Sequence, residues 1–158
     1  MAMKRLRNEY KEWSESPCEN YSICPDENNF LNWNIMLILP DDTIFEGLVL
    51  KCSMEFSTSY PNKPPSFKFE DNNFIHPNIY LDGKMCISIL HEGVDEFGYE
   101  NQSERWNPSH SVNSILMSII VVLSNPNLDS PANLDATIMW RDNYDLYKKF
   151  VYDYIANN

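Results

Sequence analysis

The chain opens with apolar residues at helical spacing. Leu6, Tyr10 and Trp13 recur at intervals of four and three positions, which places them on one face of an α-helix. The pair Ser16-Pro17 ends this pattern because proline does not continue a helix. We therefore predict an amphipathic helix over residues 3–14.

Alternating apolar and polar residues follow, a pattern typical of strands with one buried face. The alternation is clearest over residues 31–39 and 48–56, which are separated by a turn at Pro40-Asp41-Asp42. Shorter stretches with this pattern occur at 21–24 and around 67–69. Short strands joined by tight turns pair with their neighbours in the chain, so we expect a four-stranded antiparallel meander sheet.

No period is visible from Phe74 to Pro108, and an irregular stretch of this length in a compact domain is usually functional. A buried helical stripe follows, with Ser109 or Ser111 as its N-cap, at Val112, Ile115, Leu116, Ile119, Ile120 and Leu123. The tail, residues 133–156, predicts two more helices. The expected fold class is α+β: an N-terminal helix, a four-stranded antiparallel sheet, an active-site loop and three C-terminal helices, in a single domain of residues 1–158.

Composition narrows the range of partners. The 158 residues are 43% hydrophobic, enough for a core, and carry a net charge of −11, which argues against nucleic-acid binding. Four of the twelve basic residues nevertheless lie in the first eleven positions: Lys4, Arg5, Arg7 and Lys11. This cluster is either a solvated helix face or a docking surface for an acidic partner.

The chain shows no sign of a membrane, leader or metal-binding segment. The longest apolar run, residues 115–123, is too short to cross a bilayer, and no apolar region follows the first charged residues. The four cysteines, Cys18, Cys24, Cys52 and Cys86, form no CxxC pair that would indicate zinc. We expect reduced thiols in a cytoplasmic protein, with the nucleus as an alternative, and no direct membrane insertion.

One cysteine in the irregular stretch follows a polar motif. Cys86 comes eight residues after Asn78, across a turn at Asp82-Gly83, and His76-Pro77 precedes the asparagine. An asparagine NH₂ group is a suitable donor to an oxyanion that develops at a thioester carbonyl. The residues alone leave two simpler interpretations open, a buried structural thiol and an ordinary turn.

Several motifs together resemble one family. The segments 76–79, 86–87 and 106–108 are similar to the active-site signature of ubiquitin-conjugating enzymes. The segment 60–65 resembles the proline-rich loop that precedes this signature, and Phe30, Trp33 and residues 40–43 match the second strand and its turn. The resemblance covers essentially the whole chain.

A subfamily is also indicated. Fifteen residues separate Leu90 from Trp106, and they include five acids: Glu92, Asp95, Glu96, Glu100 and Glu104. This insertion resembles the G-type enzymes with an acidic active-site loop. The resemblance implies degradation-linked ubiquitin chains and, in one branch, recruitment by a partner to the endoplasmic reticulum surface.

The resemblance implies the following chemistry. Cys86 accepts ubiquitin as a thioester, a lysine then attacks that thioester, and Asn78 stabilises the oxyanion or the loop beside it. His76 and Pro77 have a structural role. The acidic loop is expected to be mobile, and gating or lysine activation is assigned to His91, Asp95, Glu96, Glu100, Asp129 and Ser130. Ser130 stands where many relatives have an acid.

The resemblance also implies three protein partners: ubiquitin, the activating enzyme and a ligase, expected to be of the RING type. Lys4, Arg5 and Arg7 would dock the activating enzyme, and Met117 with Val121 would hold the donor ubiquitin. The residues expected to dock the ligase are Pro61, Asn62, Lys63, Trp106, Pro108 and Ser109. Relatives often have a large apolar residue in place of Asn62. No cofactor is expected, since ATP is used by the activating enzyme.

Two rival functions remain open from the residues. A cysteine hydrolase would pair Cys86 with His76, His91 or His110 and would need that histidine to be oriented by Asn or Asp. A binding module that has lost activity would only present ubiquitin or a partner. Such variants usually lack the cysteine, whereas this chain has Cys86.

Overall fold

The strands of the sheet lie side by side in chain order. The computed structural model describes residues 1–158 and contains β1 (Tyr21–Pro25), β2 (Asn32–Ile38), β3 (Val49–Glu55) and β4 (Ser66–Phe69). Each strand is antiparallel to the next, with Ile35 opposite Cys52 and Met54 opposite Phe67. The predicted four-stranded meander is confirmed.

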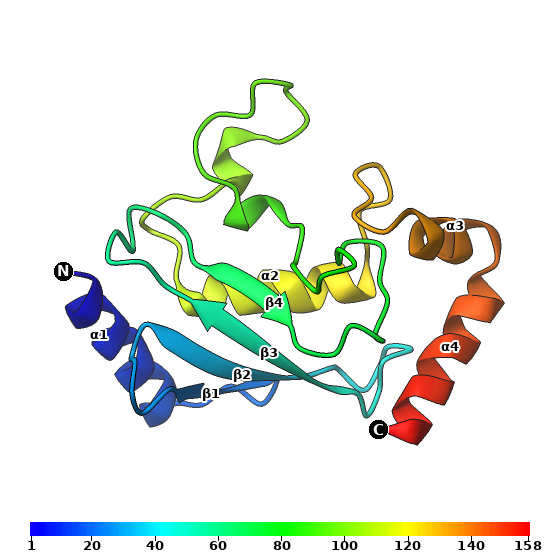
Figure 1. Ribbon diagram of the computed structural model, residues 1–158, viewed down its shortest axis with the longest axis horizontal. Helices are drawn as coiled ribbons and strands as arrows, with labels where there is room; N and C mark the ends of the chain where they lie inside the picture. Colours follow the sequence, from blue (N-terminus) through cyan, green and yellow to red (C-terminus); the bar gives the residue numbers. More distant parts are fainter.

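One face of the sheet is buried and the other is open. Along β2, buried and exposed residues alternate without exception, because successive side chains of a strand point to opposite faces. The helix α2 (Val112–Ser124) crosses behind the sheet in Figure 1, and its predicted stripe is buried in the same core as Ile35 and Leu50. Cys52 is fully buried there, as a core thiol.

The first turn of α2 is fixed from two directions. Ser111 is the N-cap, and it forms a capping box with Ser114 that satisfies exposed backbone N–H groups. The carboxylate of Glu9, more than one hundred residues earlier in the chain, accepts the N–H of Val112 at 2.7 Å. Of the two predicted caps, Ser111 is therefore the right one.

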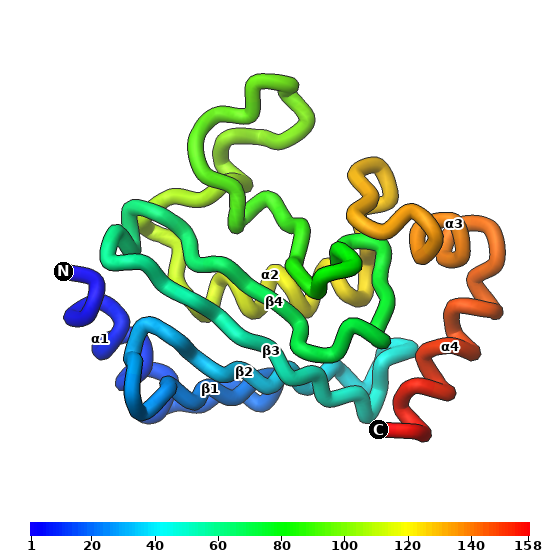
Figure 2. Tube along the Cα trace, in the orientation of Figure 1, coloured from blue at the N-terminus to red at the C-terminus, as the bar shows by residue number.

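The remaining α-helices stand at the two ends of the molecule. Figure 2 shows α1 (Ala2–Glu15) at one end and the pair α3 (Leu134–Asp142) and α4 (Tyr144–Asn157) at the other. Asn143 follows the last residue of α3 and caps α4, so this single residue joins the two C-terminal helices that the sequence predicts. No helix in the structure combines the length and the apolar character needed to cross a bilayer. The α+β arrangement is confirmed.

Candidate functional site

A short hairpin places Cys86 beside Asn78. After β4 the chain turns back, and two isolated antiparallel bridges form, Ile79 with Met85 and Lys68 with Lys84. The carbonyl of Asn78 accepts the N–H of Cys86 at 2.9 Å. The two residues are therefore neighbours through their backbones, whereas the Asn78 amide, which the sequence assigns to an oxyanion, bonds to residues 127 and 130.

Gly83 makes the hairpin turn possible. Its φ of +92° lies in the left-handed region, where a side chain is unfavourable. A Cβ atom at this position would lie 2.4 Å from the carbonyl oxygen of Phe69. Only glycine allows the turn to lie this close to β4.

His76 is enclosed and fully hydrogen-bonded. Its Nδ1 accepts the N–H of Asn78 at 3.0 Å, and its Nε2 lies 2.9 Å from the carbonyl oxygen of Leu123, to which it donates. Burial lowers the pKa of His76 to about 4, so the ring is neutral at pH 7. Neither ring nitrogen is left for a reacting group.

The Asn78 side chain binds the loop after α2. Its Oδ1 accepts the N–H of Asn127 at 2.9 Å, and its Nδ2 donates to the carbonyl oxygens of Asn127 at 2.9 Å and Ser130 at 3.4 Å. The carbonyl of the buried Pro77 accepts the N–H groups of Ala132 and Asn133. These bonds bring the exposed side chains of Asp129 and Ser130 to the side of the site.

The Cys86 thiol is half-buried between two polar groups. It lies beside the imidazole of His91 and the hydroxyl of Tyr80, and both groups lower its pKa. The contact with His91 lowers the pKa of Cys86 below its ordinary value, because a cationic imidazole favours the thiolate. In return, the sulfur and the carboxylate of Glu100 raise the pKa of His91 to about 9.

Glu100 connects His91 to the acidic loop. Its two carboxylate oxygens lie 2.9 and 3.0 Å from Nδ1 of His91, and it also pairs with Arg105. The Arg105 guanidinium is almost fully buried and donates to the carbonyl oxygens of Gly93 at 2.9 Å and Glu92 at 2.8 Å. Arg105 thus joins both ends of a loop that projects from the body (Figure 1).

The five loop acids have different surroundings. Asp95 accepts backbone N–H groups of Phe97 and Glu100, at 3.0 and 2.8 Å, which lowers its pKa. Glu92, Glu96 and Glu104 are exposed. Three large apolar residues near the tip are also exposed: Val94, Phe97 and Tyr99. The loop therefore combines acidic and apolar surface.

The two predicted ligase-docking segments adjoin each other. The indole N–H of Trp106 donates to the carbonyl oxygen of Pro61 at 2.9 Å. Asn62, Lys63, Pro108 and Ser109 are exposed around this contact. Residues far apart in the chain thus form one surface.

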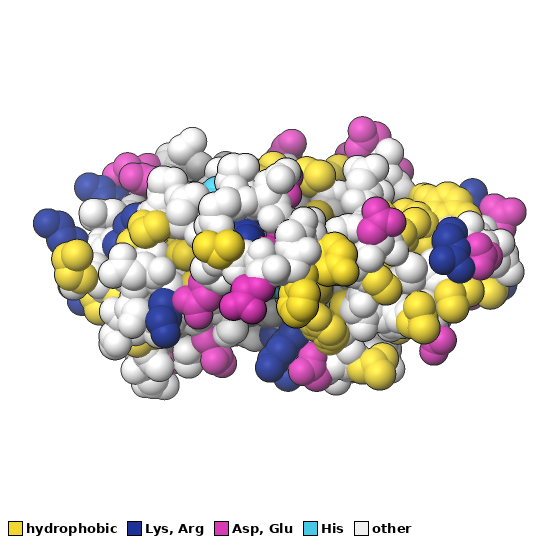
Figure 3. All heavy atoms as spheres, turned by 90° about the horizontal axis from the view of Figure 1, so that it is seen from above, with side chains coloured by type: hydrophobic (Ala, Val, Ile, Leu, Met, Phe, Trp, Pro, Cys, Tyr) yellow, Lys and Arg dark blue, Asp and Glu magenta, His cyan; other side chains and the backbone are white.

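The basic residues of α1 have two roles. Lys4 and Arg7 are exposed, and Lys and Arg side chains gather at this end of the molecule in Figure 3. Arg5 is half-buried instead: it donates to the carbonyl oxygens of Pro108 at 3.1 Å and His110 at 2.7 Å, and pairs with Glu9 at 3.1 Å. Arg5 therefore holds the Trp106–His110 segment against α1.

The two α2 residues assigned to donor ubiquitin line a shallow hollow of about 460 Å³. Val121 is 57% exposed, whereas Met117 is half-buried against the core. The other apolar residues of this hollow are Ile87, Ile89 and Val122, two of which come from the segment just after Cys86. Ile87 and Ile89 are themselves buried, so Val121 supplies most of the exposed apolar surface of this hollow.

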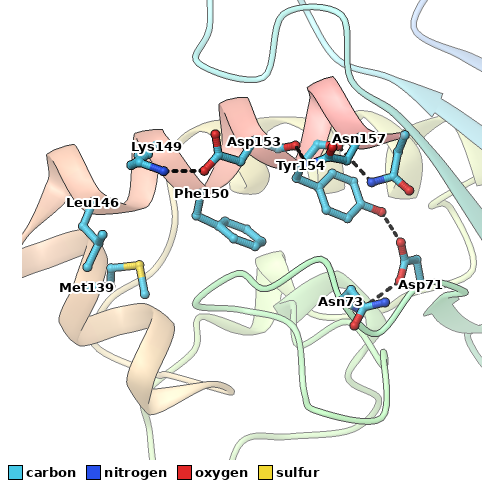
Figure 4. A pocket seen from close by; sticks show the side chains of 10 residues that line it. Asp71, Asn73, Met139, Leu146, Lys149, Phe150, Asp153, Tyr154 and Asn157 are labelled. Carbon is cyan, nitrogen blue, oxygen red and sulfur yellow. Dashed lines mark hydrogen bonds and ion pairs between the residues drawn. The ribbon is translucent and has the colours of Figure 1, made fainter.

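A second cavity of about 460 Å³ lies away from Cys86, between α3, α4 and residues 71–73 (Figure 4). Tyr154 donates a hydrogen bond to Asp71 across it, and Lys149 pairs with Asp153 on its rim. Its lining contains no thiol and no residue of the Cys86 hairpin. Nowhere in the structure do three or more His, Cys, Asp or Glu side chains come together as a metal site.

Two neighbours of the site were missed from the sequence. Tyr80 reaches Cys86 because the hairpin register places residues 80 and 84, and 78 and 86, next to each other. The Asp82-Gly83 turn in the sequence predicts this register, and it could have identified Tyr80 as a neighbour of Cys86. Arg105 was the only basic residue of its loop, but nothing local showed that its guanidinium would be buried.

Comparisons with known proteins agree with this geometry. A family model described as ubiquitin-conjugating enzyme matches residues 5–155. The protein named ubiquitin-conjugating enzyme E2 7 of Arabidopsis thaliana is 45% identical over 148 residues, 92% of this chain and 89% of its own. Human ubiquitin-conjugating enzyme E2 G2 is 45% identical over 150 residues, 94% and 90% of the two chains. The 18 kDa enzyme of Schizosaccharomyces pombe is 44% identical over 153 residues, 96% and 92%.

Proposed function

This chain belongs to the ubiquitin-conjugating enzyme family, with similarity to the G type, and we propose that Cys86 is the residue that carries ubiquitin. The observation behind this assignment is the setting of the thiol. Cys86 is half-buried beside His91 and Tyr80, with a lowered pKa, whereas Cys52 is enclosed in the core with its pKa raised by burial. Only the thiolate is nucleophilic, so Cys86 is the cysteine prepared for reaction.

Loading is a thiol exchange. The Cys86 thiolate attacks the thioester between ubiquitin and the activating enzyme, a sulfur–carbon bond forms, and the activating enzyme leaves as a thiolate. Because one thioester replaces another, the step is nearly balanced in free energy. ATP is used by the activating enzyme alone.

Discharge to lysine needs an ordered site around the thioester. We infer that Asn78 contributes through its hold on residues 127–130, since both of its side-chain groups are occupied by that loop. The hydroxyl of Tyr80 and the imidazole of His91 flank the sulfur and are available to the departing thiolate. His76 and Pro77 support the segment from within.

The apolar hollow beside Cys86 suits the donor ubiquitin. Its lining runs from Ile87 and Ile89 to Val121 on α2, so a ubiquitin tethered to the sulfur would find apolar surface within reach. Val121→Glu should leave loading intact and slow discharge to free lysine. Asn125→Glu, at the exposed position that follows the last residue of α2 and outside the hollow, is the matched control.

The surface around Trp106 and Pro61 would dock a ligase of the RING type. This assignment rests on the contact between the two segments and on the resemblance. With such a ligase, the enzyme would build degradation-linked chains in the cytoplasm or nucleus, or at the endoplasmic reticulum surface after recruitment. The exposed Asn62 should make its choice of ligase differ from that of relatives with an apolar residue there.

The rival hydrolase function has one structural argument in its favour. Of the three histidines, His91 alone lies beside Cys86, and Glu100 holds its ring in the place where the expected hydrolase would use Asn or Asp. Incubation with preformed ubiquitin chains separates the two activities. Release of free ubiquitin that depends on Cys86 would favour the hydrolase.

Charging with activating enzyme, ATP and ubiquitin tests the proposed function. We expect an adduct that disappears with reductant in the wild type, a reductant-stable oxyester in Cys86→Ser and no adduct in Cys86→Ala. Cys24→Ala removes an exposed thiol on β1 and is the matched control, which should charge normally. Charging of Cys86→Ala would refute the assignment.

A further inference from the structure

Lys84 and Cys86 point out of the same side of the hairpin. Residues 84 and 85 form bridges with β4 and with Ile79, and the exposure of the segment alternates: Lys84 is exposed, Met85 is buried and Cys86 is half-buried. In extended backbone, side chains two positions apart share a face and lie about 7 Å apart. The Lys84 amine and the Cys86 sulfur therefore face the same solvent.

The Lys84 side chain is loosely held. Two thirds of it is exposed, and its only ionic contact is a loose one, 4.0 Å from the carboxylate of Asp82. Such surface ion pairs contribute little free energy and break readily. Tyr80 lies opposite Lys84 in the hairpin and reaches the sulfur from the same face, so the amine approaches beside the Tyr80 hydroxyl. Lys68 lies opposite Lys84 on β4, on the same face. The two positive charges repel each other, which disfavours conformations in which the Lys84 side chain lies over Lys68.

We propose that Lys84 is an internal acceptor for the ubiquitin carried on Cys86, so that the enzyme modifies itself at this lysine. The inference rests on the proposed function, since it requires a thioester on Cys86. A lysine with a flexible four-carbon stem spans the distance between the two side chains. Its effective concentration at the thioester is high because both groups belong to one hairpin.

The reaction is an ordinary aminolysis. The Lys84 ammonium loses a proton to solvent, and the nitrogen lone pair attacks the thioester carbonyl carbon. A nitrogen–carbon bond forms, the carbon–sulfur bond breaks and Cys86 leaves as a thiolate. The second proton of the attacking nitrogen also goes to solvent, and no further reactant is needed.

Self-modification would limit turnover. A ubiquitin joined to Lys84 by an isopeptide bond would cover the face on which Cys86 lies and would hinder the delivery of the next ubiquitin to the sulfur. The enzyme would therefore lose charging activity as the adduct accumulates, unless another lysine reaches the thioester first. Acceptor lysine and Lys84 would compete for the same carbonyl carbon.

A single-turnover experiment tests the inference. The enzyme is charged, the activating enzyme is quenched, and no ligase or free lysine is added. We expect a reductant-resistant adduct with a ubiquitin remnant on the Lys84 peptide, at a rate independent of enzyme concentration. Lys84→Arg should reduce this adduct at least about tenfold, because arginine keeps the charge but is not a nucleophile. Lys68→Arg, opposite Lys84, is the matched control and should behave as wild type.

Three outcomes contradict the inference. The resistant adduct of Lys84→Arg equals that of the wild type, its rate rises in proportion to enzyme concentration, or no resistant adduct forms on a chain that charges normally. In each case the proposed function stands, because the reductant-sensitive thioester is seen. A chain that never charges would overturn the proposed function and the inference together.

Discussion

The carbonyl oxygen of Asn78 accepts the N–H of Cys86, while the Asn78 side chain binds both the N–H and the carbonyl of Asn127. One residue therefore joins the nucleophile hairpin to the loop after α2. The backbone bond places the sulfur, and the side-chain bonds place Asp129 and Ser130. A substitution of Asn78 should therefore keep the position of the sulfur and disturb the position of the loop that contains Asp129 and Ser130.

Asn78→Ala should load ubiquitin at nearly the wild-type rate and discharge it to lysine more slowly, by up to about 10²-fold if an oxyanion donor is also lost. It should also lower the free energy of unfolding by about 1–3 kcal/mol, because backbone groups of the 127–130 loop lose their partner. Single-turnover kinetics and urea unfolding measure the two effects. Asn72→Ala, an exposed change nearby, is the control. Equal defects in loading and discharge would contradict this separation.

His91→Asn should shift the reaction of Cys86 with iodoacetamide to higher pH. The imidazole of His91 is the main cause of the lowered pKa of Cys86, so its removal raises that pKa and reduces the thiolate fraction at pH 7. The variant should react several-fold more slowly at pH 7 and approach the wild-type rate at high pH. His110→Asn changes a histidine that does not contact the thiol. Coincident pH profiles for wild type and His91→Asn would exclude the thiolate–imidazole pair.

Stability should fall as pH drops from 6.5 toward 4. In the unfolded chain His76 binds a proton near its ordinary pKa of 6.5, whereas in the folded protein burial lowers the pKa to about 4. Between these values the unfolded state binds more protons, so acidification favours it, by about 3 kcal/mol over the whole window. Urea unfolding from pH 6.5 to 5 measures the slope before most carboxylates titrate. The slope should be smaller in His76→Gln, and an unchanged slope would assign the effect to other groups.

Lys4→Glu combined with Arg7→Glu should slow charging without loss of stability. Both residues are exposed on α1, so the change acts on the approach of the activating enzyme, and the wild-type rate should fall with added salt. Lys148→Glu with Lys149→Glu makes the same change of charge on α4, at the other end of the molecule, and is the matched control. Equal slowing by the two double variants would mean that net charge, and not a docking site, controls the rate.

Glu92→Gln combined with Glu96→Gln should slow ubiquitin-chain formation at low salt and leave charging unchanged. Both side chains are exposed and bind no other group of the loop, so their contribution is electrostatic attraction of the acceptor. The difference from wild type should disappear at high salt. Asp41→Asn with Asp42→Asn, in the turn after β2, is the control. Chain formation at the wild-type rate across all salt concentrations would exclude this electrostatic role.

The sequence predicts the fold well because the periodicity of its hydrophobic residues is clear in the strands and in α2. The alternation over β2 and β3 and the stripe of α2 correspond to the core residues observed, since burial acts on each position of these elements separately. The position of Cys86 beside Asn78 follows from one turn between them. Local information was sufficient for these features.

The contacts that the sequence does not show join distant segments. Arg5 is one of four basic residues of α1, and only the packed structure turns it toward Pro108 and His110. Glu9 reaches the first turn of α2, and Glu100 reaches both His91 and Arg105. The sequence shows which residues are charged but not which groups they contact, because those contacts depend on tertiary packing.

The bridge between Lys84 and Lys68 has a consequence for solubility. β4 is the last strand of the sheet, and its outer edge would otherwise present unpaired N–H and C=O groups to other molecules. The N–H of Phe69 and the carbonyl of Phe67 are instead occupied by Gly83 and Met85. The hairpin that presents the nucleophile is thus also the cover of a sheet edge, and replacement of Gly83 would expose a template for strand pairing between molecules. Aggregation, and not only lost activity, is the expected fate of such variants.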